Sequence, residues 1–314
     1  MDVTVSQERQ GLAAALGAFG LWGVFPLFLS LLAPAGAFEI SAHRVVWTFL
    51  VCVLVLALTR TLRGTWRLAA DRRLVGRLAL GAVFLAGNWL IFVIAIEIGR
   101  VVDASLGYFL NPLVSAGLAV VVLRERLRPL QWAALGIAGA GIVVMSVGLG
   151  TAPWIALGLA TTFGLYGLTK KQVGPRVTAI SGLSIETVVL LLPALGYLAY
   201  LVASGGSTFG RDVGVGGSLG HALLLVSSGV ASAIPLVLFA AASRRLPLAT
   251  VAMTQFLTPV MQLIAGVLVL GEQMSPARWW GFAFVWGALV VLSVDIVRST
   301  RAPRIARPLD PPPA

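Results

Sequence analysis

Long runs of apolar residues, separated by short polar segments, dominate the pattern along the chain. Ten runs can be distinguished, and each is close to the roughly 20 residues that cross a bilayer as a helix. Hydrocarbon offers no partner to backbone polar groups, so each run must bond internally, and strand-like alternation is absent. The pattern predicts an all-α membrane protein with ten transmembrane helices, at 11–32, 41–59, 74–97, 102–123, 129–149, 152–169, 180–203, 221–243, 248–270 and 277–297.

Composition agrees with this prediction. Apolar residues make up 58% of the 314 residues and charged ones only 11%, against about 25% charged in soluble domains. A single cysteine, Cys52, and two histidines exclude a disulfide framework or a metal cluster within one chain, so no cofactor is expected. The alternative that the first run is a signal peptide is weak, because the run exceeds the usual 7–15 residues of such a segment.

The net charge of +11 becomes informative once the basic residues are sorted by loop. With the N-terminus in the cytoplasm, nineteen of the 23 lysines and arginines fall on cytoplasmic segments, as short inside loops require. We therefore expect both termini inside. The charges are scattered over loops rather than gathered on one face, so nucleic acid is not an expected partner. Residues 204–220 are expected to form a flexible outer loop, and 298–314 a disordered cytoplasmic tail.

The two halves of the chain resemble one another. Residues 109–132 align with 256–279 without a gap, with nine identities that include Pro112/Pro259 and Glu125/Glu272. FGLWG (19–23) likewise matches FGLYG (163–167). We therefore divide the chain into two five-helix repeats, 1–149 and 150–297, followed by the tail.

An odd number of spans per repeat makes the second repeat enter the membrane from the opposite side. Inverted repeats are a recurring plan of secondary transporters, in which the halves exchange conformations around a shared site. The sequence thus favours a permease for small organic molecules, with the lipid bilayer as its other partner. A channel or a non-transporting scaffold stays open. An integral membrane enzyme is disfavoured because no nucleophile motif is present, and the chain lacks a loop for ATP phosphates.

Several motifs resemble the drug/metabolite transporter superfamily of EamA type, and within it the RarD group of chloramphenicol-sensitivity permeases. This resemblance covers about residues 8–298. It implies a multi-pass permease of the bacterial inner (plasma) membrane that moves metabolites or drugs, usually outward. The matching stretches are HRVVW (43–47), GNWLIFVIA (87–95), DASLGYFLNPLV (103–114), GLYGLTKK (164–171), IETVVLLLP (185–193) and QFLTP (255–259).

Two repeat-related prolines lie inside their spans, and interrupted helices often mark a transporter site. Pro112 frees the carbonyl of Tyr108, and Pro259 frees that of Gln255. Each proline accompanies a polar stripe at helical spacing, which we expect to line a central cavity. Packing kinks and interhelical hydrogen bonds are the alternatives. The stripes are Tyr108, Asn111 and Ser115 on one helix, and Gln255, Thr258 and Gln262 on the other.

Aromatic and amide side chains on other spans could complete a substrate site. Trp22, Asn88, Trp89 and Tyr166 combine apolar surface with polar edges, which suits an amphiphilic organic solute. The alternative is an aromatic belt at the membrane interface.

Charged residues inside the spans are functional candidates by default. Arg44 could attract an anionic group or extend outward to the interface. Glu186 aligns with Arg44 in the repeat. It is expected as a lone carboxylate that prefers its neutral form and so could couple transport to protons. Glu125 and Glu272 are expected to tether turns or to act as gate struts.

Small residues on the fifth and tenth spans could let helices pack closely. Such packing could occur within one chain or between two chains, so a homodimer stays open. The residues are Gly136, Ala140, Gly281 and Gly287.

Overall fold

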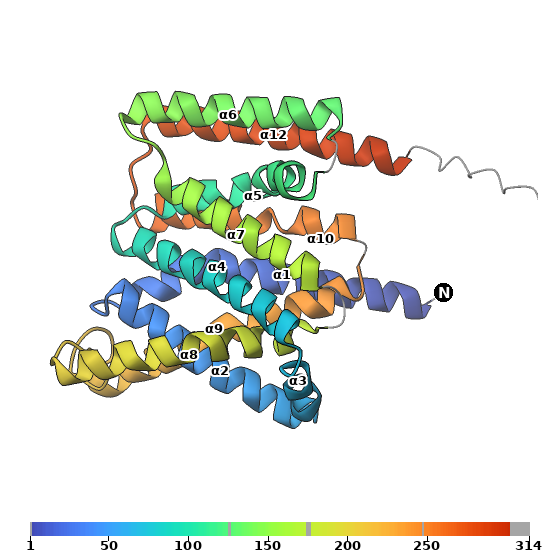
Figure 1. The fold of residues 1–314 in the computed structure, drawn as a ribbon. Coiled ribbons are helices and arrows are strands. Elements are labelled where there is room, and N and C mark those ends of the chain that lie inside the picture. The colour runs from blue at the N-terminus through green and yellow to red at the C-terminus, as the bar shows by residue number, and fades with distance from the viewer. Residues whose placement is uncertain (1, 125–126, 174–176, 247, 302–314) are drawn as a thin grey trace, which may run out of the picture.

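The computed structural model describes residues 2–124, 127–173, 177–246 and 248–301, and in this part every regular element is a helix (Figure 1). The all-α prediction is confirmed for these residues. Eight of their helices are long and apolar enough to cross a membrane. The first half of the chain forms α1 (Asp2–Ser30), α2 (Ala37–Leu58), α3 (Leu62–Leu68), α4 (Arg72–Glu97), α5 (Val101–Leu123) and α6 (Pro129–Leu149).

The second half follows the expected order with one difference. The apolar run 248–270, predicted as one helix, is divided into three pieces. The short helix α3 of the first half is likewise absent from the sequence prediction. The elements are α7 (Trp154–Val173), α8 (Ala179–Ala203), α9 (Gly217–Ser243), α10 (Leu248–Thr254), α11 (Leu257–Ile264), the π-helical segment η1 (Ala265–Val269) and α12 (Pro276–Arg301).

The break between α10 and α11 lies just before Pro259. Proline cannot donate to the carbonyl four residues earlier. That carbonyl, on Gln255, instead accepts the backbone N–H of Thr258 at 3.2 Å, which tightens the turn and separates the two helices. The repeat-related Pro112 lies within the uninterrupted helix α5. The same residue in the two halves is therefore accommodated in two different ways.

The helices form a layered bundle (Figure 1). α6 and α12 pack together along one edge, α2, α8 and α9 lie along the opposite edge, and the other long helices lie between them. If the helices are matched as the predicted repeat matches them, three of the neighbour pairs correspond to three others. The pair α5–α7 becomes α11–α1, α4–α7 becomes α9–α1, and α2–α9 becomes α8–α4, and all of these pairs are in contact.

Glycines permit the closest helix crossings. A Cβ atom on Gly229 of α9 would lie 2.3 Å from the backbone carbonyl carbon of Trp47 in α2, so only glycine fits there. Gly281 of α12 packs against Met145 of α6, within one chain. A Cβ atom added to Gly136 or Gly287 would have nothing within 4 Å, so their faces are open to lipid or to a second copy.

The N-terminus and the end of α12 lie at the same end of the bundle (Figure 1). We call this the terminal end, and the other the distal end. α12 continues to Arg301, so the first residues of the expected tail are helical, while 302–314 lie outside the described residues.

Candidate functional site

Arg44 is the most unusual buried residue of the bundle. It lies on α2 with 3% of its surface exposed, so the alternative that it extends to the interface is wrong. Its guanidinium carbon lies 4.2 Å from the ring centroid of Trp89 on α4 and 4.9 Å from that of Phe25 on α1. Nε donates to Oγ of Ser232 on α9 at 3.3 Å. We call these four residues the Arg44 cluster, and they join four helices.

The positive charge of this cluster is only partly compensated. Burial of an ion without a counter-ion costs several kcal/mol, and each desolvated cation–π contact offsets about 2 kcal/mol of that cost. Among the described residues no carboxylate forms an ion pair with Arg44, and its Nη1 has no hydrogen-bond partner. Within the described part of the chain, the cluster thus contains a positive charge without a counter-ion and an N–H group, on Nη1, without a hydrogen-bond acceptor.

Asn88 precedes Trp89 on α4, and its side chain bonds α5 and α7. Its Oδ1 accepts the hydroxyl of Tyr108 on α5 at 3.3 Å. Its Nδ2 donates to the carbonyl of Leu159 and to Oγ1 of Thr162 on α7, both at 3.2 Å. The structure therefore brings Asn88 and Tyr108 together, but the Asn88 amide is largely used to hold α4 and α7 together.

Aromatic rings connect the Arg44 cluster with Tyr108 and Asn88. Phe92 of α4 stacks on Phe25 with centroids 6.4 Å apart and meets Tyr108 edge-on at 5.7 Å. One turn beyond Tyr108, Asn111 is 3% exposed, and neither its Oδ1 nor its Nδ2 has a partner in the described part of the chain. Buried amides are rarely left unpaired, so Asn111 is a candidate ligand contact.

The repeat-related stripe on α11 behaves differently. Thr258 Oγ1 donates to the carbonyl of Phe19 at 2.8 Å, and Gln262 Nε2 donates to that of Trp22 at 3.1 Å, both on α1. These residues hold α11 against α1, as the interhelical alternative expects. The ring of Trp22 packs with Phe239 of α9, and Gln255 is half-buried at the helix break.

Glu186 on α8 is not the lone carboxylate that the sequence predicts. Its Oε1 lies 2.5 Å from Nζ of Lys170, and its Oε2 accepts the hydroxyl of Tyr166 at 3.2 Å. The prediction is wrong because Lys170 lies in the last turn of α7 rather than in a loop, and from there its long side chain reaches Glu186. The side chain of Glu186 is 1% exposed and that of Lys170 is 30% exposed.

A second buried carboxylate, missed by sequence reasoning, holds the segment between α8 and α9. Glu39 of α2 accepts hydrogen bonds from Ser207 Oγ at 2.9 Å, from Thr208 N at 2.7 Å and from Thr208 Oγ1 at 3.0 Å. Thr208 Oγ1 also lies 2.9 Å from Nε2 of His221 on α9. The sequence predicts flexibility for this segment, yet these bonds attach it to α2. Glu39 was missed because the predicted second span begins two residues after it.

Glu272 connects the two halves at the distal end. Its carboxylate accepts the backbone N–H groups of Val101 at 2.5 Å and of Val102 at 2.9 Å, which are unsatisfied donors at the start of α5. Burial raises the pKa of Glu272. It therefore caps a helix of the other half rather than the turn into its own next helix. Its repeat partner Glu125 lies outside the described residues.

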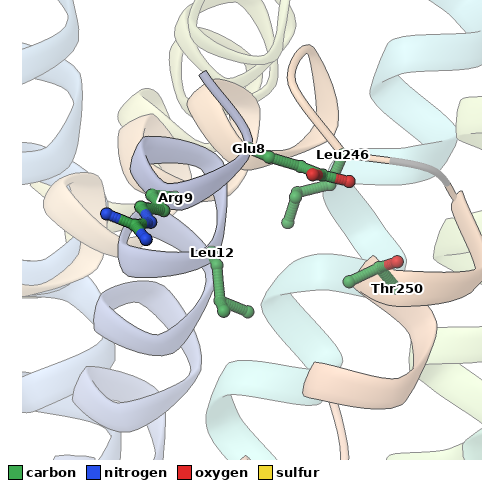
Figure 2. A pocket seen from close by; sticks show the side chains of 5 residues that line it. All are labelled: Glu8, Arg9, Leu12, Leu246 and Thr250. Atoms are coloured by element: carbon green, nitrogen blue, oxygen red, sulfur yellow. The ribbon is translucent and has the colours of Figure 1, made fainter. Parts of the chain in front are cut away.

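A cleft of about 280 Å³ lies at the terminal end, far along α1 from the Arg44 cluster. Figure 2 shows the carboxylate of Glu8 turned towards Leu246, while the guanidinium of Arg9 points to the other side of α1. Leu12 and Thr250 complete the lining. Among the described residues, no group of three His, Cys, Asp or Glu side chains is arranged to hold a metal ion.

Comparison with known proteins identifies the family of this chain. Residues 9–147 match the EamA-like transporter family. The chain is 44% identical to Protein RarD of Streptomyces exfoliatus over 95% of this chain and 93% of that protein. It is 37% identical to an uncharacterized transporter of Vibrio cholerae over 98% of this chain and all of that protein.

A solved crystal structure shares the fold. It has a TM-score of 0.58 at 18% sequence identity and covers 95% of this chain and 99% of that chain. Together with the apolar helices, the relatives show a multi-pass membrane protein of a transporter family. The chain belongs to the EamA-like drug/metabolite transporter family and, within it, to the RarD group.

Proposed function

We propose that this protein is a secondary transporter that exports small organic metabolites or drugs across the bacterial inner membrane by alternating access. One observation carries the proposal: three neighbour pairs, α5–α7, α4–α7 and α2–α9, correspond to pairs that are also in contact when the two five-helix halves are exchanged. Two halves with equivalent contacts can exchange conformations at modest cost, which opens a shared site to either side in turn.

The proposed topology has ten spans, with both termini in the cytoplasm. It includes α7 and the interrupted α10–α11–η1 as spans, and it makes the terminal end cytoplasmic. The position of both chain ends at the terminal end supports it (Figure 1). The distribution of arginine and lysine supports it as well, because short cytoplasmic loops favour these residues.

The contacts at the distal end favour a state closed to the outside. Glu272 bonds the start of α5, and Ser105 Oγ of α5 donates to the carbonyl of Pro259 on α11 at 2.7 Å. Both links join the first half to the second. Opening the outer side would require these links to separate.

We assign the substrate to the region around the Arg44 cluster, with Asn88, Tyr108 and Asn111 as further contacts. Glu186, together with Lys170, remains the candidate for proton coupling. Trp22, Tyr166, Gln255 and Gln262 are assigned supporting positions. Trp22 packs on Phe239, Tyr166 donates to Glu186, and Gln262 donates to the carbonyl of Trp22, so each of these three contacts another helix.

A reversible disulfide tests alternating access. A Cβ on Gly266 of η1 would lie 3.5 Å from that of Val101 on α5, within the range for a disulfide. We expect Val101→Cys/Gly266→Cys, in a Cys52→Ser background, to transport when reduced and to stop when oxidised. Solutes are first identified by comparing metabolites of cells with and without the protein, and are then followed in vesicles.

The matched control is a disulfide between helices that should stay together. A Cβ on Gly281 would lie 3.3 Å from that of Met145, so Met145→Cys/Gly281→Cys joins α12 to α6. Its oxidation should leave transport unchanged. Full transport by the oxidised Val101→Cys/Gly266→Cys protein would contradict alternating access through the distal end.

A further inference from the structure

We infer that the Arg44 cluster binds the carboxylate of an organic anion, so that the substrates are monocarboxylates with an apolar body. This inference rests on the proposed transport function and specifies its substrate class. Its basis is Arg44, a residue that is 3% exposed, whose Nε–H donates to Ser232 and whose Nη1 has no partner in the described part of the chain.

The second half of the chain shows what the first half lacks. The repeat alignment places Glu186 at the position of Arg44 and Lys170 at the position of Pro26. In the second half the two side chains form an ion pair. In the first half proline cannot provide a counter-charge, and the neighbouring position holds Phe25. A ligand carboxylate would therefore supply the charge that the chain itself supplies in the other half.

The geometry of the cluster also favours a planar anion. The ring centroids of Trp89 and Phe25 lie 4.2 and 4.9 Å from the guanidinium carbon of Arg44. Contacts of this kind occupy the faces of a guanidinium and leave its N–H edge for a carboxylate, which it can bind through two parallel hydrogen bonds. A compact ammonium or a neutral amide lacks this match.

The surroundings supply the apolar part of the site. Phe25, Phe92 and Tyr108 form a continuous series of ring contacts that leads from Arg44 towards Asn111. An aromatic or aliphatic body could pack along these rings while its carboxylate pairs with Arg44. The unpaired amide of Asn111 could then accept or donate a hydrogen bond to a second polar group.

The test compares three probes of nearly equal shape and different charge: phenylacetate, phenylacetamide and phenethylamine. Each is titrated against the purified full-length protein in detergent at constant ionic strength, and the thermal unfolding midpoint is followed. Indole-3-acetate and its amide form a second, larger pair. We expect each carboxylate to bind at least tenfold more tightly than its amide, as for other charge-assisted pairs.

Two variants locate the effect. Arg44→Gln should remove the preference for the carboxylate, while Arg44→Lys should retain part of it, because charge remains but the planar edge is lost. Arg211→Gln is the matched control. Arg211 is exposed between α8 and α9, where its Nη2 donates to the carbonyl of Gly205. The comparison of probes on the unaltered protein needs no variant and holds even if Arg44→Gln fails to fold.

Two results would overturn the inference: neither carboxylate stabilises the unaltered protein more than its amide does, or Arg44→Gln keeps the preference. A lower unfolding midpoint without probe, with the preference intact, would assign Arg44 a structural role only. The disulfide test is independent of these results. If oxidation stops transport while no carboxylate preference exists, the transporter proposal stands and the anionic substrate class is wrong.

Discussion

The ion pair between Lys170 and Glu186 gives a sharp quantitative test of the interior. At 2.5 Å and an effective dielectric constant of about 20, the two charges attract by roughly 7 kcal/mol, and desolvation of both ions offsets much of this. Removal of one partner leaves the other charge alone. We expect Lys170→Met to lower the free energy of unfolding by about 3–5 kcal/mol, because Glu186 is 1% exposed and cannot reach water.

The opposite substitution should cost less. Lys170 is 30% exposed, so its ammonium can be hydrated once Glu186→Gln removes the carboxylate. We expect the free energy of unfolding to fall by about 1.5–3 kcal/mol, the range for a lost hydrogen bond to a charged group. The double variant should be more stable than Lys170→Met alone, since no isolated charge remains. Tyr166→Phe, which removes only the 3.2 Å hydrogen bond to Glu186, should cost about 1 kcal/mol.

The assay is reversible unfolding of the purified protein from detergent micelles by sodium dodecyl sulfate, analysed as a double-mutant cycle. If the costs of Lys170→Met and Glu186→Gln simply add in the double variant, the two side chains do not interact and the reasoning is refuted.

The same variants test proton coupling. Glu186→Gln should retain solute exchange across vesicles and lose stimulation by a pH gradient, whereas unchanged stimulation would remove Glu186 as the coupling site.

Three further predictions concern the fold. Gly229→Ala should lower the free energy of unfolding by about 1–3 kcal/mol through overlap with α2, while Gly196→Ala, which meets open space, should not; equal thermal midpoints would contradict this crossing. Burial raises the pKa of Glu272, so the folded protein binds this proton more tightly than the unfolded chain does. The resulting stabilisation is complete below the ordinary glutamate pKa of about 4.3 and is lost as the pH rises through the raised value. The native protein should therefore lose stability relative to Glu272→Gln when unfolding is measured at stepwise higher pH. In a cysteine-free background, an impermeant thiol reagent applied from outside should label Asp212→Cys and leave Arg63→Cys unlabelled; the reverse would overturn the topology.

The positions of the helices were predictable because apolar runs and short polar loops follow directly from the solvent properties of the bilayer. Both Pro112 and Pro259 were expected to interrupt their spans, but the chain is broken only before Pro259, and Pro112 lies inside an unbroken helix; which of the two prolines breaks its helix was not predictable. What differs is tertiary: Thr258 and Gln262 bond the backbone of α1, whereas Asn111 has no such partner in the described part of the chain. The residues next to each proline do not indicate which of the two helices is broken.

The residues of the candidate site were predictable in part. A buried arginine and nearby aromatic residues could be named from their places inside spans, but the partners could not. Lys170 reaches Glu186 from the end of a helix, where a one-turn error in the boundary changes a loop residue into an interior one. Glu39 lies just before the predicted span for the same reason. Polar side chains near span ends are therefore the ones that sequence patterns misplace most readily.

The bonds made by Glu39 change how the covalent link between α8 and α9 should be regarded. Ser207 and Thr208 are attached to α2, and α2 also packs along both helices. Arg211, a few residues further on, is exposed. A protease that cuts after Arg211 would sever the chain without removing what keeps its two pieces in place. The nicked protein should remain one particle in detergent, and two separately expressed fragments that meet at this point should assemble into it.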